Sequence, residues 1–324
     1  MYGIAFAFYL LFMATMPYTN TCLFKFRQRR LRFLITLGVF FFENRFIAFK
    51  NEDNNMAYLA PAEFAKKVVD AGEAKLHMAT RDVLIRAFMA GAILALAAVF
   101  AITIAVQTGV PLIGALLFPV GFCMLYLLGY DLLTGVFVLT PLAWLDKRPG
   151  VTWKRILKNW GWVFLGNFTG CLTVAVLMAA VYTMGFATDP NPVGVKIAHI
   201  GEERTLGYAE FGFAGWMTIF IRGMLCNWMV SLGVIGAMMS TTVSGKFIAM
   251  WMPIMLFFAM GFEHSVVNMF LFPFAMMMGG DFSITDYFLW NELPVALGNL
   301  VGGLALTGLA LYTTHVRTGE KKEF

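Results

Sequence analysis

The pattern of hydrophobic and polar positions changes at about residue 84. From there on, long apolar runs alternate with short polar stretches. A membrane-spanning helix needs about 20 consecutive, mostly apolar residues. The chain reaches that length six times, at residues 84–106, 112–140, 157–187, 212–240, 247–280 and 293–314. This pattern predicts an all-α integral membrane protein with six spans.

The second and fifth predicted spans are longer than a bilayer requires, and polar residues interrupt both. The second contains Asp131 and Thr134 beside Gly129 and Gly135. The fifth contains Glu263, His264, Ser265 and Asn268 beside Gly261. Non-helical backbone at membrane depth is tolerated only where it is buried in protein or lines a cavity. Two broken helices therefore indicate a transport site between them.

A short internal repeat relates the two halves of this region. The sequence Gly-Asn-Phe-Thr-Gly at 166–170 in the third span matches Gly-Asn-Leu-Val-Gly at 298–302 in the sixth. Asp131 precedes Asn167 by 36 residues, and Glu263 precedes Asn299 by the same 36. Each half has three spans, an odd number, so the second half must run opposite to the first. The pattern predicts an inverted-topology repeat whose site lies where the broken helices meet near the midplane.

Basic residues mark alternate loops and so predict the orientation. They are Lys66, Lys67, Lys75, Arg81 and Arg86, then Lys147, Arg148, Lys154, Arg155 and Lys158, then Lys246, and finally Arg317, Lys321 and Lys322. The positive-inside rule places both ends of the core, residues 56–316, in the cytoplasm, with 317–324 as a cytoplasmic tail. Trp153, Trp160 and Trp162 are typical of an interfacial belt at the start of the third span. A plasma membrane or bacterial inner membrane fits best.

Composition agrees with a membrane setting and sets the first 55 residues apart. The 324 residues are 60% hydrophobic and 13% charged, about half the charged share of a typical soluble domain. Residues 1–55 hold seven Lys and Arg against three Asp and Glu, so +4 of the net +5 lies there. This distribution argues against a nucleic-acid partner. The segment fits a membrane-surface anchor or a gene-start error upstream of Met56, and we favour the second explanation.

His264 is the strongest candidate for a functional residue, because ionisable groups at membrane depth are costly and are functional hypotheses by default. Burial favours the neutral imidazole. It can donate a hydrogen bond to an anion, or share a proton so that the anion crosses as its neutral acid. A structural histidine bonded to the backbone is an equal alternative. Thr134 offers a hydroxyl to a pore, and the buried amide of Asn227 can bond His264, substrate or a neighbouring helix backbone.

The acidic residues at the two breaks are expected to be structural. Asp131 is suited to capping the N–H groups of the following half-helix, and Glu263 to accepting backbone N–H groups of the interrupted helix. The sequence contains no HExxH, GxSxG, P-loop or GxGxxG motif, and His77, His199 and His315 are isolated. It therefore predicts no enzyme, no cofactor and no metal site.

Four stretches of the core resemble the formate/nitrite transporter family. They are 118–121 with 129–135, 158–160 with 166–170, 222–230, and Gly-Phe-Glu-His-Ser-Val-Val-Asn-Met at 261–269. The last stretch is highly specific, and the resemblance covers about residues 57–315. It implies an aquaporin-like fold, a homopentamer in membrane lipid with one pore per protomer, and transport of formate, nitrite or similar small weak acids. Proton sharing by His264 would link this transport to protons.

The same positions imply roles for single residues. His264 resembles the central pore histidine, Asn227 its partner, and Thr134 the polar residue of the loop that breaks the second span. The implied outer constriction is Phe118 and Phe257, and the implied inner one is Phe122, Leu133 and Val230. Family members often carry a vestibule lysine at the position of Phe211, and Lys196 is the nearest candidate here.

The resemblance favours nitrite over formate, because residues 207–216, 240–242, 251–253 and 289–291 are similar to the nitrite-associated branch. The main alternative is a neutral-solute channel, for water or glycerol, on the same architecture. That alternative predicts no role for His264 protonation. A structural or regulatory membrane protein with a closed pore is a further alternative.

Overall fold

A computed structural model describes residues 57–317. The N-terminal extension, residues 1–55, and nearly all of the predicted tail lie outside the described residues. Within the described part every named element is helical, and the one β-bridge joins Tyr58 to Ser240.

Four helical stretches are long and apolar enough to cross a membrane. They are α4 (Thr80–Thr108), α8 (Trp153–Tyr182), α11 (Gly212–Met239) and the continuous stretch Ile284–Val316. The last runs through α14 (Ile284–Tyr287), η1 (Phe288–Glu292), α15 (Leu293–Gly303), η2 (Leu304–Leu309) and η3 (Tyr312–Val316). These correspond to the first, third, fourth and sixth predicted spans.

The second and fifth predicted spans each fold as separate shorter helices. The second contains α5 (Pro111–Leu117), α6 (Pro119–Leu127) and α7 (Leu133–Leu145). The fifth contains α12 (Val243–Ala259) and α13 (Ser265–Met277). Residues 128–132 and 260–264 are not helical. Two non-helical segments thus fall where polar residues interrupt the apolar pattern of the sequence.

Glycine ends the helix before each of these segments. Gly129 and Gly261 adopt the left-handed conformation, with φ of 72° and 64°. The N–H of the following residue then reaches back to the carbonyl five residues earlier, from Tyr130 to Leu125 and from Phe262 to Phe257, at 2.9 and 3.0 Å. This is the Schellman arrangement, which favours glycine because a Cβ is strained at positive φ.

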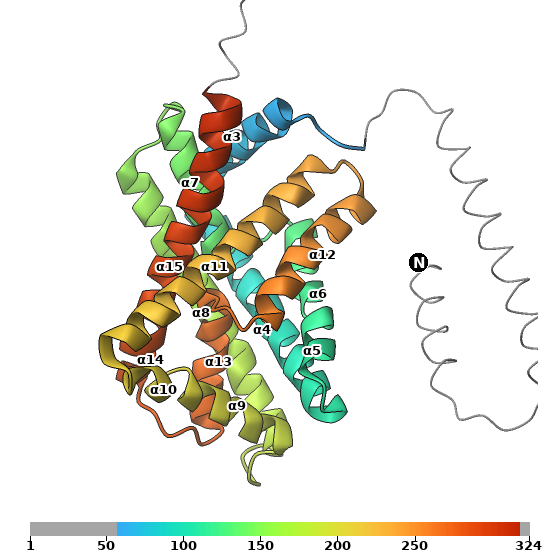
Figure 1. The fold of residues 1–324 in the computed structure, drawn as a ribbon, viewed down its shortest axis with the longest axis vertical. Coiled ribbons are helices and arrows are strands. Elements are labelled where there is room, and N and C mark those ends of the chain that lie inside the picture. Colours follow the sequence, from blue (N-terminus) through green and yellow to red (C-terminus); the bar gives the residue numbers. More distant parts are fainter. Residues whose placement is uncertain (1–56, 318–324) are drawn as a thin grey trace, which may run out of the picture. The chain divides into compact units, whose positions relative to one another are not determined.

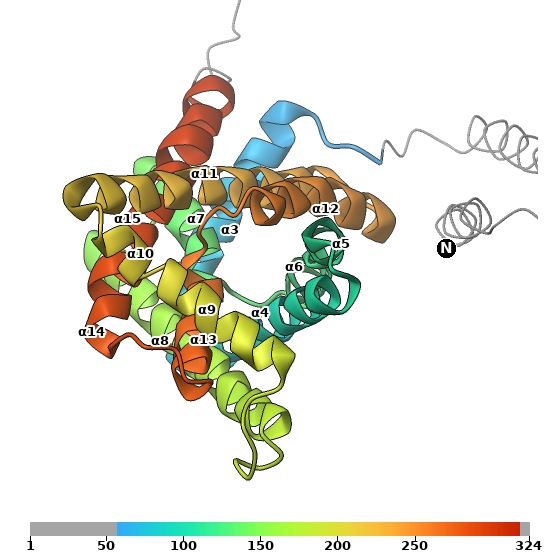
Figure 2. The same ribbon diagram turned by 60° about the horizontal axis from the view of Figure 1, so that its bottom comes forward.

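The two Gly-Asn-x-x-Gly segments pack long helices closely together. A Cβ on Gly170 of α8 would overlap the Phe88 carbonyl of α4, and a Cβ on Gly302 of α15 would overlap the Met224 carbonyl of α11. Such small residues let membrane helices approach to backbone contact. The pairs α4–α8 and α11–α15 therefore form two matching supports around the non-helical segments (Figures 1 and 2).

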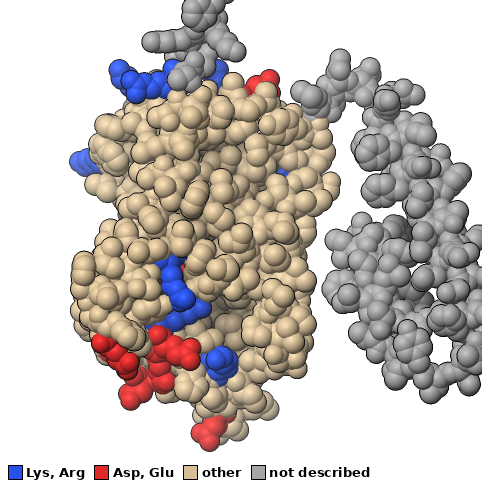
Figure 3. Space-filling view, viewed as in Figure 1, with Lys and Arg blue, Asp and Glu red and all other residues tan. Residues whose placement is uncertain are grey.

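The remaining elements lie at two opposite ends of the helix bundle. The α3 helix (Pro61–His77) and η3 lie together at one end, where the Phe64 and His315 rings are 6.4 Å apart (Figure 1). At the other end are α9 (Pro192–Glu203), α10 (Leu206–Ala209) and α14. Charged side chains gather towards these ends and in one hollow, and the visible surface between them is almost free of charge (Figure 3).

Candidate functional site

His264 and Thr134 meet where the two non-helical segments come together. His264 is the N-cap of α13, and its Nδ1 accepts the Val267 N–H at 3.2 Å. A neutral imidazole with Nδ1 as acceptor carries its proton on Nε2. That nitrogen lies 3.2 Å from the Thr134 hydroxyl, in the first turn of α7. Both side chains are buried. The imidazole therefore donates to Thr134, which leaves the hydroxyl hydrogen of Thr134 available to another acceptor.

Two asparagines hold the segments in the same way. Asn167 accepts the Leu133 N–H and donates to the Asp131 and Ala87 carbonyls, at 2.9, 2.9 and 2.8 Å. Asn299 accepts the Ser265 N–H and donates to the Glu263 and Gly223 carbonyls, at 2.9, 2.9 and 2.7 Å. Each amide thus satisfies backbone groups that lie in a non-helical segment or at the start of the helix that follows it.

These bonds correct the expected partners of the acidic residues. Asp131 does not cap α7, because Asn167 takes the Leu133 N–H, and the Asp131 carboxylate forms an ion pair with Lys75 of α3 instead. Glu263 accepts no backbone N–H within the described residues. Its carboxylate accepts from Asn268 Nδ2 at 3.0 Å and lies 3.4 Å from Arg204 Nε. Both acids bind side chains from other parts of the chain, which sequence spacing alone does not indicate.

Asn227 bonds to the backbone rather than to His264. Its Nδ2 donates to the Thr134 and Asn299 carbonyls at 3.2 and 2.7 Å. Of the partners considered from sequence, the neighbouring helix backbone is the one found. Asn227 therefore joins the first turn of α7 to the middle of α15, and its effect on the His264–Thr134 pair passes through the Thr134 backbone.

An aromatic cluster covers one face of the histidine. The rings of Phe118, Phe122 and Phe257 contact one another edge to face, with centroids 5.7 to 5.9 Å apart. Phe122 and Phe257 also contact the His264 ring, at 5.4 and 5.8 Å. Phe122, expected in an inner constriction apart from the other two, thus touches both. The three rings are apolar and buried, so a charged species there loses its water without gaining an ionic partner.

A cavity opens on the α3 side of Thr134. It has a volume of about 270 Å³, and its lining includes Phe122, Val230, Thr134, Asp131 and Lys75. Leu133 is buried, but its side chain is not among the lining residues. Of the expected inner constriction, Phe122 and Val230 therefore face this space.

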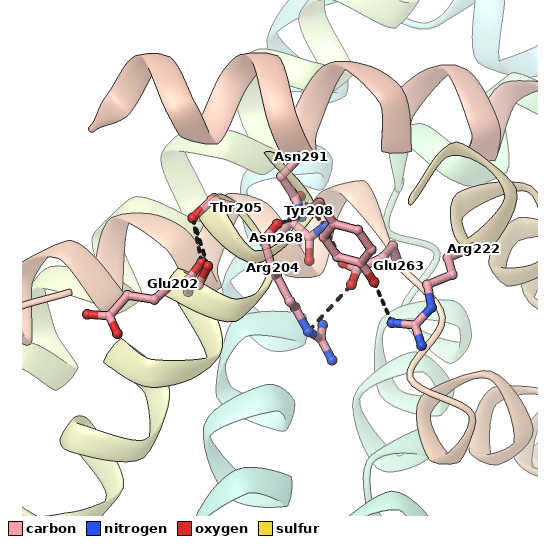
Figure 4. A network of polar contacts seen from close by, with 9 residues as sticks. Glu202, Arg204, Thr205, Tyr208, Arg222, Glu263, Asn268 and Asn291 are labelled. Atoms are coloured by element: carbon pink, nitrogen blue, oxygen red, sulfur yellow. Dashed lines mark hydrogen bonds and ion pairs between the residues drawn. The ribbon is translucent and has the colours of Figure 1, made fainter. Parts of the chain in front are cut away.

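Two arginines, Arg222 on α11 and Arg204 at the end of α9, lie beside the His264 segment. Arg222 precedes Asn227 on α11, whereas Val230 and the cavity follow it. Arg222 Nη1 donates to the Tyr208 hydroxyl at 2.5 Å, and Arg204 pairs with Glu263 (Figure 4). Lys196, the expected vestibule cation, is exposed on α9 and takes no part in this network of described residues. The cations that contact the His264 segment are thus arginines, one of them in a loop that the charge pattern alone does not single out.

Glu292 is a buried acid that the sequence patterns did not single out. Its carboxylate binds the Ser265 hydroxyl, next to His264 in sequence, and the Tyr287 hydroxyl at 2.9 Å. All three side chains are buried. The only available signal was an acidic residue near the start of the sixth predicted span. Glu292 anchors the first turn of α13 through Ser265, separately from the Glu263–Arg204 pair.

The described helices and charge distribution define an integral membrane protein with a buried polar site between helix ends. Within residues 57–317, no group of three or more His, Cys, Asp or Glu side chains is placed to hold a metal ion. The site combines hydrogen-bond donors, apolar rings and nearby cations.

Comparison with known proteins establishes the family. The formate/nitrite transporter family model matches residues 62–313, and the chain belongs to that family. A relative named "Probable formate transporter", from Methanothermobacter thermautotrophicus, is 33% identical over 278 residues, covering 81% of this chain and 98% of the relative.

Two solved structures share the fold. One, described as "FNT family ion channel", has a TM-score of 0.66 at 22% identity and covers 78% of this chain and 98% of its own. Another, described as "Pentameric formate channel with formate bound", has a TM-score of 0.60 at 23% identity and covers 72% and 96%.

Proposed function

We propose that this protein passes small monovalent weak-acid anions, formate or nitrite, through a pore at the His264–Thr134 pair. The observation that carries the proposal is this buried pair, which keeps a hydroxyl hydrogen available beside an apolar ring cluster. Membership of a transporter family and the formate bound to one structural relative support the substrate class.

We infer that six spans form an inverted repeat, with the second and fifth broken at the pore. The matching glycine turns, the matching asparagine bonds and the equal spacing of 36 residues support this architecture. Both ends of the described core lie at the α3 end, which the positive-inside rule assigns to the cytoplasm. Assembly as a homopentamer is supported by the pentameric state of one structural relative.

Helix polarity at the site favours an anion. The first turns of α7 and α13 both begin at the pair, at Leu133 and Ser265. Helix N-termini carry partial positive charge, which stabilises a nearby anion. The same field disfavours an imidazolium at His264. We therefore assign the resting state to a neutral histidine that donates through Thr134.

The apolar ring cluster supports the proposal that transport is linked to protons. An anion loses its hydration at Phe118, Phe122 and Phe257, whereas its neutral acid crosses them at far lower cost. A proton that His264 takes up and returns to the anion oxygen makes that acid and restores the neutral imidazole. To hold the second proton on Nδ1, His264 must release the Val267 N–H, so proton transfer loosens the cap of α13.

The two arginines are the candidates for attracting anions to this pore. Arg204 and Arg222 carry two positive charges, and Glu263, paired with Arg204, carries one negative charge beside them. We propose that this arginine pair, rather than exposed Lys196, concentrates anions at the mouth opposite to the cavity.

Two lines of evidence favour different substrates. The relatives' names favour formate. The preference for nitrite rests on the four short stretches of sequence that are similar to the nitrite-associated branch. Both ions are small monovalent anions with two acceptor oxygens, so the pair at Thr134 fits either. Flux measurements with each anion are needed to decide which one is preferred.

The test is formate and nitrite uptake by proteoliposomes of the full chain across a pH series, with His264→Asn as the matched variant. Asparagine retains an N-cap acceptor for α13 but cannot titrate. We expect wild-type uptake to increase with acidity and the variant to lose that dependence. Water permeation without anion uptake in the wild type would instead establish the neutral-solute alternative.

A further inference from the structure

A second pocket lies away from the pore, where α3 ends and α8 begins. Its volume is about 250 Å³, and its polar lining includes Lys75, His77, Arg155, Lys158, Asn159 and Trp162. Among the described residues, no Asp or Glu contributes to this lining. The pocket is therefore a concentrated basic site.

Two of the pocket's basic side chains form no ion pair with another described residue. Lys75 forms an ion pair with Asp131, whereas neither Arg155 nor Lys158 has a carboxylate within 4.0 Å in residues 57–317. A Cβ placed on Gly150 would lie 3.2 Å from Arg155 Nη1 and 3.4 Å from His77 Nε2. The arginine and histidine therefore share one rim of the pocket.

The pocket wall also holds buried polar atoms that lack a partner. Asn159 is 7% exposed, and its Nδ2 donates to the Lys75 carbonyl at 3.2 Å. Its Oδ1 and the Trp162 Nε1 are buried with no hydrogen-bond partner in the described residues. An unpaired buried polar group is costly. An unpaired acceptor and an unpaired donor in one basic pocket match a ligand that has both a hydroxyl and anionic oxygens.

Neighbouring tryptophans place the pocket at the level of lipid headgroups. The rings of Trp144, Trp153 and Trp160 form a chain at the start of α8, with centroids 5.0 and 6.5 Å apart. Tryptophan gathers at membrane–water interfaces, and basic pockets at helix ends bind anionic lipid headgroups. A phosphate diester is therefore abundant where this pocket opens.

We propose that this pocket binds the phosphate headgroup of an anionic phospholipid. Arg155 and Lys158 contact the phosphate oxygens, and the Asn159 amide oxygen accepts a headgroup hydroxyl. Lys75 lines both this pocket and the cavity at Thr134. A bound headgroup thus lies beside the Lys75–Asp131 ion pair that holds residues 128–132 in place.

The experiment is a titration of the purified full chain with phosphatidylglycerol, followed by native mass spectrometry. The test variant is Arg155→Gln/Lys158→Gln. The control is Arg81→Gln/Lys154→Gln, which also removes one arginine and one lysine charge, but from exposed positions outside the pocket lining. We expect the test variant to bind phosphatidylglycerol at least about tenfold more weakly, because it lacks the two cations that donate hydrogen bonds to the phosphate. The control should remain within about twofold of the wild type, and phosphatidylcholine should bind weakly to all three.

Two results would overturn the proposal. Equal weakening in both double variants would assign lipid retention to general surface charge. Displacement of phosphatidylglycerol by inorganic phosphate at equal concentration would make free phosphate the ligand. The same spectra report whether each variant assembles like the wild type. If the double test variant does not, Lys158→Gln against Lys154→Gln gives the same comparison with one charge.

Discussion

Replacing Asn167 and Asn299 by alanine, one at a time, tests the correspondence between the two halves of the molecule. Each side chain is fully buried and makes three hydrogen bonds to backbone groups at a helix interruption. If the halves are related as proposed, the two substitutions remove equivalent interactions and have similar effects.

The size of the effect follows from the bonds lost. Side-chain hydrogen bonds between membrane helices average about 0.6 kcal/mol and reach about 1.7 kcal/mol. Three bonds per asparagine therefore give a loss of roughly 2 to 5 kcal/mol for each variant. Asn159→Ala is the matched control, because that buried amide makes a single hydrogen bond within the described chain, to the Lys75 carbonyl. It should cost about 0.6 kcal/mol.

Thermal unfolding in detergent, followed by loss of the assembled peak in size-exclusion chromatography, measures these differences. We expect Asn167→Ala and Asn299→Ala to unfold at similar temperatures, both well below Asn159→Ala. A variant at either Asn167 or Asn299 that is as stable as Asn159→Ala would refute the equivalence of the two supports.

Three further perturbations test other parts of the account. Gly302→Ala should prevent assembly, because its Cβ would overlap the Met224 carbonyl. The control Gly233→Ala should assemble, because a Cβ there meets no atom closer than 3.5 Å. Expression followed by size-exclusion chromatography compares the two variants. Phe257→Ala opens the ring cluster. It should raise water permeability and lower the pH dependence of formate uptake, both measured in proteoliposomes. If neither value changes, the ring cluster is not the barrier to charged species. Arg204→Gln should slow anion uptake at low salt by roughly fivefold, and its uptake rate should approach that of the wild type at high salt. Lys196→Gln should not slow uptake. Slower uptake by Lys196→Gln than by Arg204→Gln would instead identify Lys196 as the residue that attracts anions.

The positions of the two non-helical segments could be predicted from sequence because their causes are local. Gly129 and Gly261 end helices at positive φ, and polar residues follow each of them within a few positions. The spacing of Asp131 to Asn167 and of Glu263 to Asn299 likewise corresponds to a direct hydrogen bond from each amide to a backbone carbonyl.

The partners of the side chains at the interruptions could not be predicted in this way. Asp131 pairs with Lys75 from a helix that precedes the first span, and Glu263 pairs with Arg204 from a loop. Both contacts depend on how distant elements pack, which has no periodic signal in the chain. From sequence, the best expectation was that these acids cap the nearby helices. In the folded chain, Asn167 and Asn299 accept those backbone N–H groups instead.

Glu292 was missed for a related reason. A single acid beside an apolar run signals burial, but its partner Ser265 becomes a neighbour only through the packing of α13 against η1. Phe122 shows the same limit in the ring cluster. Its sequence position relative to Phe118 does not show that the rings of both touch Phe257.

Formate uptake by proteoliposomes containing Thr134→Val, compared with Thr134→Ser, tests the role of the central pair most directly. Valine keeps the shape of threonine and removes the hydroxyl that we propose links His264 to a passing anion, whereas serine retains the hydroxyl. We expect the serine variant to keep pH-dependent uptake and the valine variant to lose most of it while remaining assembled. Uptake by the valine variant equal to that of the wild type at every pH would contradict passage of the anion at the Thr134–His264 pair.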